Sequence, residues 1–139
     1  MSRNLEVKDF DILTFKLPTG SILNRFEYIN IDLDEFHKSD IIESILLRIP
    51  LKRICIHDDS NSEQVFIGSD IIQTIEEFYS NSFKLTTDII DLNGVFYYKD
   101  LPRSIQRRID QNYIEFVVLN TWNTELDYRL IKNKIKKSN

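Results

Sequence analysis

The stretch EQVFIGSDIIQTIEEFYSNSFKL, from Glu63 to Leu85, changes its hydrophobic period part-way along. Its first five residues, EQVFI, include β-branched and aromatic side chains, which favour a β-strand. Gly68-Ser69 then breaks the pattern, and we expect the Ser69 hydroxyl to accept a backbone N–H at the head of a helix over residues 70–80. The apolar residues of that helix recur at helical spacing, as Ile71, Ile72, Ile75, Phe78 and Tyr79.

Similar changes of period predict the elements on the N-terminal side. Asp9 to Leu17 alternates loosely and is expected to form a strand, closed by a turn at Pro18-Thr19-Gly20, whereas residues 22–31 show no clear period. A strand over Leu51 to His57 is expected to pair with EQVFI as a hairpin across a polar turn. Between them we expect a helix over residues 35–48, capped by Asp32 or Asp34. Its buried side would hold Phe36, Ile41, Ile42, Ile45 and Leu46.

The C-terminal side is expected to alternate in the same way. Phe83 to Tyr98 should hold short strands, with Asn93-Gly94 as a tight type I′ turn. Pro102 should open a short helix, and Tyr113 to Leu119 has the length and β-branched content of a buried strand. In the short helix, Ile105 and Ile109 should face inward and Arg103, Arg107 and Arg108 outward. A last helix over about residues 124–136 should bury Leu126, Leu130, Ile131 and Ile135.

Length and composition favour one folded domain. The chain has 139 residues, of which 42% are hydrophobic and 29% charged, with only three glycines and three prolines. It can therefore bury a single core, and no repeat or linker divides it. We expect one compact domain over residues 1–139, α+β in class, with a small mixed sheet and packed helices. No apolar run reaches the roughly 20 residues that a bilayer requires, and the polar N-terminus predicts that the chain is not exported.

Two features of the composition bear on compartment and source. The single cysteine, Cys55, excludes an internal disulfide and a CxxC zinc cluster, and it fits an intracellular, reducing compartment. The sequence has no alanine but 21 isoleucines and 11 asparagines. This bias is typical of an AT-rich genome and indicates a low-GC bacterium or a virus as the source.

The charges are unevenly distributed along the chain. Residues 1–101 carry 10 basic and 18 acidic side chains, a net charge of −8, and residues 102–139 carry 8 basic and 4 acidic ones, a net charge of +4. Clustered cations predict, as one alternative, a nucleic-acid-binding face. The overall charge of −4 favours a solvated face or a docking surface for a protein. We expect that surface to include Trp122, Arg129, Lys132, Lys136 and Lys137.

Three phrases carry a resemblance to a known family. They are SDIIESILLRIPLKRICI (Ser39 to Ile56), EQVFIGSDIIQTIEEFYSNSFKL, and LNGVFYYKDLPRSIQRRIDQNYIEFVVL (Leu92 to Leu119). With the order of elements, they resemble the N-terminal domain of GmrSD-type modification-dependent restriction enzymes over about residues 21–119. The resemblance implies a ParB/sulfiredoxin-like fold. The family's enzymes continue into a nuclease domain, so cleavage by this chain alone is not expected.

The signature of that family is degenerate in this chain. The family motif, a strand ending in Asp-Gly-Gln-Gln-Arg before a helix, is associated with nucleotide binding and hydrolysis, and the aligned residues here are Ile67-Gly68-Ser69-Asp70-Ile71. Ile67 replaces a carboxylate that could hold a metal or activate water, and Ile71 replaces a guanidinium that could bind a phosphate. A second family feature, a Gln-Arg pair, corresponds to Asn24-Arg25, which leaves Arg25 as a candidate phosphate contact.

Each remaining polar candidate has a simpler structural explanation. Asp70 lies where an acid is favourable against a helix dipole, and Gly68 suits a tight turn, although helix N–H groups there could also meet a phosphate. Cys55 and His57 share a strand face, but no second pair of ligands has a suitable spacing, so no metal site is expected. No calcium loop, nucleotide-binding loop or hydrolase motif occurs.

The sequence therefore predicts a non-catalytic binding or assembly module, related to the GmrSD N-terminal domain and without a cofactor. It would work beside a partner chain, by self-association, or within a larger particle of viral or phage origin. The alternative from the enzyme class is residual nucleotide binding or hydrolysis through Arg25 and Asp70. A third function, nucleic-acid binding through the C-terminal basic face, would show an affinity that falls steeply with salt.

Overall fold

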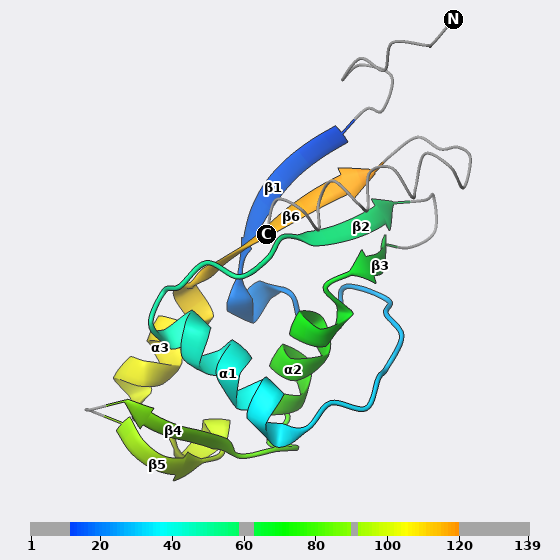
Figure 1. The fold of residues 1–139 in the computed structure, drawn as a ribbon. Helices are drawn as coiled ribbons and strands as arrows, with labels where there is room; N and C mark the ends of the chain where they lie inside the picture. Colours follow the sequence, from blue (N-terminus) through cyan, green and yellow to red (C-terminus); the bar gives the residue numbers. More distant parts are fainter. Residues whose placement is uncertain (1–11, 59–62, 90–91, 120–139) are drawn as a thin grey trace, which may run out of the picture.

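The computed structural model describes residues 12–58, 63–89 and 92–119, which form an α+β domain with a four-stranded mixed sheet and three α-helices (Figure 1). The predicted fold class and mixed sheet are thus confirmed. The elements are β1 (Ile12–Pro18), the 3₁₀ turn η2 (Thr19–Ser21), α1 (Glu35–Leu46), β2 (Ile54–Asp58), β3 (Glu63–Ile67), α2 (Ser69–Tyr79), β4 (Leu85–Ile89), β5 (Leu92–Phe96), the 3₁₀ turn η3 (Tyr98–Asp100), α3 (Arg103–Gln111) and β6 (Tyr113–Leu119). None of the helices in these ranges is long and apolar enough to cross a membrane.

The large sheet has the strand order β1-β6-β2-β3, so the last described strand lies in its interior. β6 runs antiparallel to β1 and parallel to β2, while β2 and β3 form the predicted hairpin. The register places Phe116 of β6 opposite both Phe15 and Ile54, and these residues share one face of the sheet. Phe116 and Val117, which point to opposite faces of the sheet, are both buried, and burial on both faces explains the almost continuous apolar run from Ile114 to Val118.

Helices α1 and α2 supply most of the second layer of the core. In Figure 1 the large sheet lies at one end of the molecule and the separate β4–β5 hairpin at the other, with α1 and α2 between them. Phe116 is fully buried and stacks on Phe15 and Phe26, with ring centroids 5.1 Å and 5.0 Å apart. The helical residues that are completely buried with it include Ile42, Ile45, Ile72, Ile75 and Phe78.

Helix α1 is shorter than predicted, and one of its apolar residues faces solvent. Asp34 is the N-cap, accepting the backbone N–H of His37 at 2.7 Å, and the helix ends at Leu46. Ile41, Ile42 and Ile45 are buried as expected. The prediction for Phe36 is wrong, because its side chain is 85% exposed. Phe36 lies on the other side of α1 from Ile41, Ile42 and Ile45, because five, six and nine residues of helix rotate it away from their face.

Two local turn predictions are also corrected. The N-cap of α2 is Gly68, in the left-handed conformation with φ 98°, and Ser69 is the first helical residue, so no side chain caps this helix. Asn93-Gly94 is not a turn: both residues lie inside β5, opposite Asp88 and Thr87. The strand predicted from Leu51 begins only at Ile54. Residues 22–31 form no regular element beyond one bridge between Glu27 and Gln64.

The half-buried carboxylate of Asp110 connects α3 to the rest of the core. Asp110 accepts hydrogen bonds from the hydroxyls of Tyr79 and of Tyr98, the latter at 2.9 Å, and the two rings stack with centroids 4.5 Å apart. Burial and the neighbouring carboxylate raise the pKa of Tyr98 to about 12. These contacts join α2, η3 and α3 at one point. The prediction of a last helix over residues 124–136, with its buried and basic residues, lies outside the described residues.

Candidate functional site

The corner between β3 and α2 is where the resemblance predicts nucleotide chemistry. Here Asp70 is hydrogen-bonded to His37 (Nε2 to Oδ2, 3.0 Å), lies 3.5 Å from the Lys52 ammonium, and accepts the backbone N–H of Ile71 at 3.0 Å. Burial alone would raise the pKa of the Asp70 carboxyl, but these partners outweigh it and hold the pKa below its usual value. Asp70 is thus a structural anion that links α1, the segment before β2, and α2.

The other residues of the corner are committed to packing. Ile67 and Ile71 are 7% and 2% exposed, and Ile71 belongs to the main core cluster. Gly68 is needed for its backbone: a Cβ built there would lie 2.9 Å from a side-chain carbon of Ile54. The Asp70 carboxylate already lies at the positive N-terminal end of α2. It therefore offsets the helix dipole that would otherwise attract a phosphate to this position.

This electrostatic arrangement predicts a specific acid sensitivity. Because the pKa of Asp70 is lower in the folded chain than in the unfolded one, its carboxylate stabilises the fold above the usual aspartate range. That contribution is lost as the pH falls through the folded pKa. Asp70→Asn should therefore lower the Tm near pH 6 but reduce the further drop on acidification, as thermal unfolding between pH 6 and about pH 3 would measure. Asp40→Asn, at an exposed carboxylate, is the control and should follow the wild type.

Arg25, the candidate phosphate contact, is held by other residues. Its Nε lies 2.9 Å from Glu63 Oε1, and its guanidinium lies 5.3 Å from the Phe26 ring centroid and 5.6 Å from that of Phe15. Glu63 begins β3 and Gly68 follows its end, about 15 Å further along the strand. Arg25 is therefore tied to the opposite end of β3 from the motif corner.

Cys55 and His57 lie on β2 as predicted, and Cys55 is fully buried. Burial raises the pKa of the Cys55 thiol to about 12, so the thiolate that would bind metal or attack an electrophile is disfavoured. Within residues 12–58, 63–89 and 92–119, no three His, Cys, Asp or Glu side chains gather as a metal site. The positions of Cys55 and His57 are therefore explained by the packing of β2.

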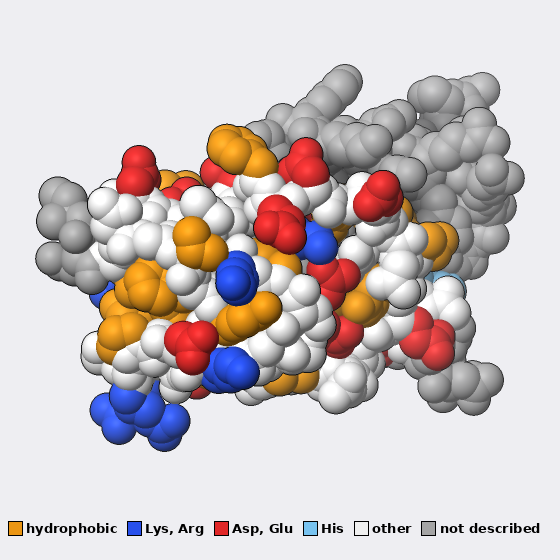
Figure 2. Space-filling model, turned by 90° about the horizontal axis from the view of Figure 1, so that it is seen from below, with side chains coloured by type: hydrophobic (Ala, Val, Ile, Leu, Met, Phe, Trp, Pro, Cys, Tyr) orange, Lys and Arg blue, Asp and Glu red, His pale blue; other side chains and the backbone are white. Residues whose placement is uncertain are grey.

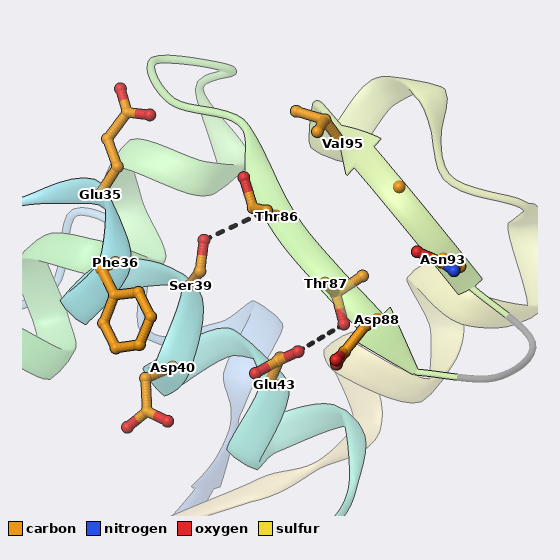
Figure 3. Close-up of a pocket in the computed structure, with 11 residues that line it drawn as sticks. Glu35, Phe36, Ser39, Asp40, Glu43, Thr86, Thr87, Asp88, Asn93 and Val95 are labelled. Atoms are coloured by element: carbon orange, nitrogen blue, oxygen red, sulfur yellow. Dashed lines mark hydrogen bonds between the residues drawn. The ribbon is translucent and has the colours of Figure 1, made fainter.

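A hollow lies between α1 and the β4–β5 hairpin, and the sequence did not predict it (Figure 3). We call it the α1–hairpin groove; its volume is about 710 Å³. Ser39 Oγ accepts the Thr86 backbone N–H at 3.0 Å, and Thr87 Oγ1 donates to Glu43 at 2.5 Å. These two bonds fix the distance between helix and hairpin. The lining residues are Glu35, Phe36, Ser39, Asp40, Glu43, Thr86, Thr87, Asp88, Asn93, Gly94 and Val95.

The groove combines exposed apolar side chains with negative charge. Phe36 is 85% exposed and Val95 is 55% exposed, and four carboxylates line the groove without any lysine or arginine. Figure 2, seen from below the view of Figure 1, shows apolar, acidic and basic side chains interspersed on this face of the molecule. The sequence signal that could have located the groove was Phe36, because it is an aromatic residue on the side of α1 away from the buried face.

The predicted basic surface is described only in part. Arg103, Arg107 and Arg108 are exposed on α3 as expected, and Arg108 also donates from Nε to the Leu46 carbonyl at 2.6 Å. Trp122, Arg129, Lys132, Lys136 and Lys137 lie outside the described residues. Comparison with models of protein families, with curated proteins and with solved structures gave no match to this chain.

Proposed function

We propose that this chain is a protein-binding module that receives a lysine- or arginine-bearing apolar segment of a partner in the α1–hairpin groove. The observation that carries the proposal is the exposed aromatic ring of Phe36 beside four carboxylates in a groove of about 710 Å³. Exposed aromatic side chains in a concave site are common anchors of protein interfaces. Carboxylates around such an anchor select cationic partners and speed their association.

The β3–α2 corner supports a binding function over a catalytic one. Ile67 and Ile71 are buried, and Asp70 is already paired with His37 and Lys52. None of these groups provides a guanidinium that could bind a phosphate, or a free carboxylate that could bind a metal. We propose that the chain is a relative of the GmrSD N-terminal domain, with a ParB/sulfiredoxin-like fold, in which the scaffold remains and the chemistry is lost.

A calorimetric titration tests the proposal with a defined probe. The capped peptide Lys-Lys-Leu-Phe-Leu-Lys-Lys should bind the wild-type chain, and Phe36→Ser should weaken that binding about tenfold, since burying a phenyl ring contributes about 1.5–3 kcal/mol. Tyr113→Ser removes an aromatic side chain that is 63% exposed on β6 and should leave the affinity unchanged. Both variants change only exposed residues, so the fold should be retained.

Other outcomes would redirect the assignment. Equal weakening by Phe36→Ser and Tyr113→Ser would mean that the peptide adheres to any exposed ring, and the groove would not be the site. Micromolar binding of Mg-ATP that is lost in Arg25→Ala would favour the residual nucleotide function instead. Binding of a DNA duplex whose affinity falls steeply with salt would favour the nucleic-acid function.

A further inference from the structure

A second hollow continues the α1–hairpin groove towards the C-terminal end of α1. Its volume is about 270 Å³, and its lining residues are Leu46, Leu47, Ile89, Leu92, Ile105 and Arg108. On α1, Phe36, Asp40, Glu43 and Leu47 follow one another at intervals of three or four residues, so they lie on one side of the helix. On the hairpin, Ile89 and Leu92 directly follow and precede the groove residues Asp88 and Asn93. The two hollows therefore follow one another along the same side of α1, and we refer to the two together as the channel.

The charge changes sign along this channel. The four carboxylates, including that of Asp88 on β4, line the first hollow, and the guanidinium of Arg108 lines the second, at the C-terminal end of α1. Arg108 uses Nε for the Leu46 carbonyl, and no carboxylate of the described residues forms an ion pair with it. Its two terminal nitrogens are thus available to a carboxylate from outside, which a guanidinium binds well. Between the charged ends the second hollow offers apolar side chains.

We infer that the partner segment is dipolar: a run with lysine or arginine at one end, an apolar anchor in the middle and a carboxylate at the other end, which lies over Arg108. This inference rests on the proposed function and specifies its ligand. From Phe36 to Leu47 the helix rises about 16 Å, which matches about five residues of extended peptide. The cationic end lies over Glu35 and Asp40 and against the ring of Phe36 between them, and the apolar anchor contacts the leucines of the second hollow.

Two capped peptides that differ only at one end test the inference in 0.15 M salt. They are Lys-Lys-Leu-Phe-Leu-Glu-Glu and Lys-Lys-Leu-Phe-Leu-Lys-Lys. The chain carries a net charge of −4, so charge alone would favour the all-lysine peptide. The inference predicts the opposite order, with the dipolar peptide binding about threefold more tightly, as an exposed ion pair allows. Arg108→Glu should reverse this preference.

The matched control is Arg107→Glu, which makes the same charge change on the neighbouring residue of α3 that does not line the channel. It should leave the preference for the dipolar peptide in place, because screening at this salt is strong beyond about 8 Å. Equal binding of the two peptides by the wild type, or an equal effect of both arginine variants, would overturn the inference while the groove stands. No binding of either peptide would overturn the proposed function itself.

Discussion

Gly68→Ala should be among the most destabilising single-methyl changes in this chain, lowering the free energy of unfolding by about 3 kcal/mol. Gly68 has φ 98°, a conformation that costs an L-residue roughly 1–2 kcal/mol. The added Cβ would also lie 2.9 Å from Ile54 Cγ1 and 3.2 Å from Ile54 Cα, so the buried strand β2 would have to move. Urea denaturation measures the change.

Gly20→Ala is the control for that substitution. A Cβ at Gly20 would meet Asp110 at 3.6 Å, which is ordinary van der Waals contact, and no unusual φ is required there. Its effect on the free energy of unfolding should stay within about 0.5 kcal/mol. A similar loss for both alanine variants would show that the β3–α2 corner is not shaped as described.

Phe116→Ala should cost about 4 kcal/mol, as other large-to-small changes of buried aromatic residues do. Phe116 is fully buried at the centre of the sheet and stacks on Phe15 and Phe26, so its removal leaves a cavity that neither paired strand can close. Tyr113→Ala on the same strand removes a ring that is 63% exposed and should change the stability little. Near-equal effects of the two changes would contradict the sheet register.

The sequence predicted the elements whose signals are periodic or chemical. The helical spacing of Ile71, Ile72, Ile75 and Phe78 located α2, and the β-branched and aromatic side chains of EQVFI located β3. The start of α1 was expected at Asp32 or Asp34, and Asp34 is the N-cap. Such signals depend only on residues that are close together in the sequence, so they can be recognised without knowledge of the tertiary structure. The α+β class followed from their order.

The predictions from sequence were wrong where a tertiary contact decides between two possible local structures. Asn93-Gly94 has the composition of a tight turn, yet the strands pair Leu85 with Phe96 and Ile89 with Leu92, a register that buries Leu85 and Leu92 together. Ser69 could have capped α2, but the close approach of Gly68 to Ile54 sets the left-handed turn one residue earlier. The α1–hairpin groove was missed because it joins segments about 50 residues apart in the sequence.

The Asp70 cluster illustrates the same limit for function. An acid in the first turn of a helix was correctly explained by the helix dipole, but its partners His37 and Lys52 come from two other segments. Their contacts decide whether the carboxylate is available for chemistry. Only the folded arrangement shows that Asp70 is committed to them.

The most direct test of the central claim, that interaction uses the α1–hairpin groove and not the β3–α2 corner, is a backbone-amide NMR titration. We expect Lys-Lys-Leu-Phe-Leu-Glu-Glu to shift the amides of Phe36, Asp40, Thr86 and Val95 first, in α1, β4 and β5. Mg-ATP should leave the amides of Gly68 to Ile71 in place. Saturable shifts at Gly68 to Ile71 with Mg-ATP, and none in α1 or the hairpin with the peptide, would contradict the account.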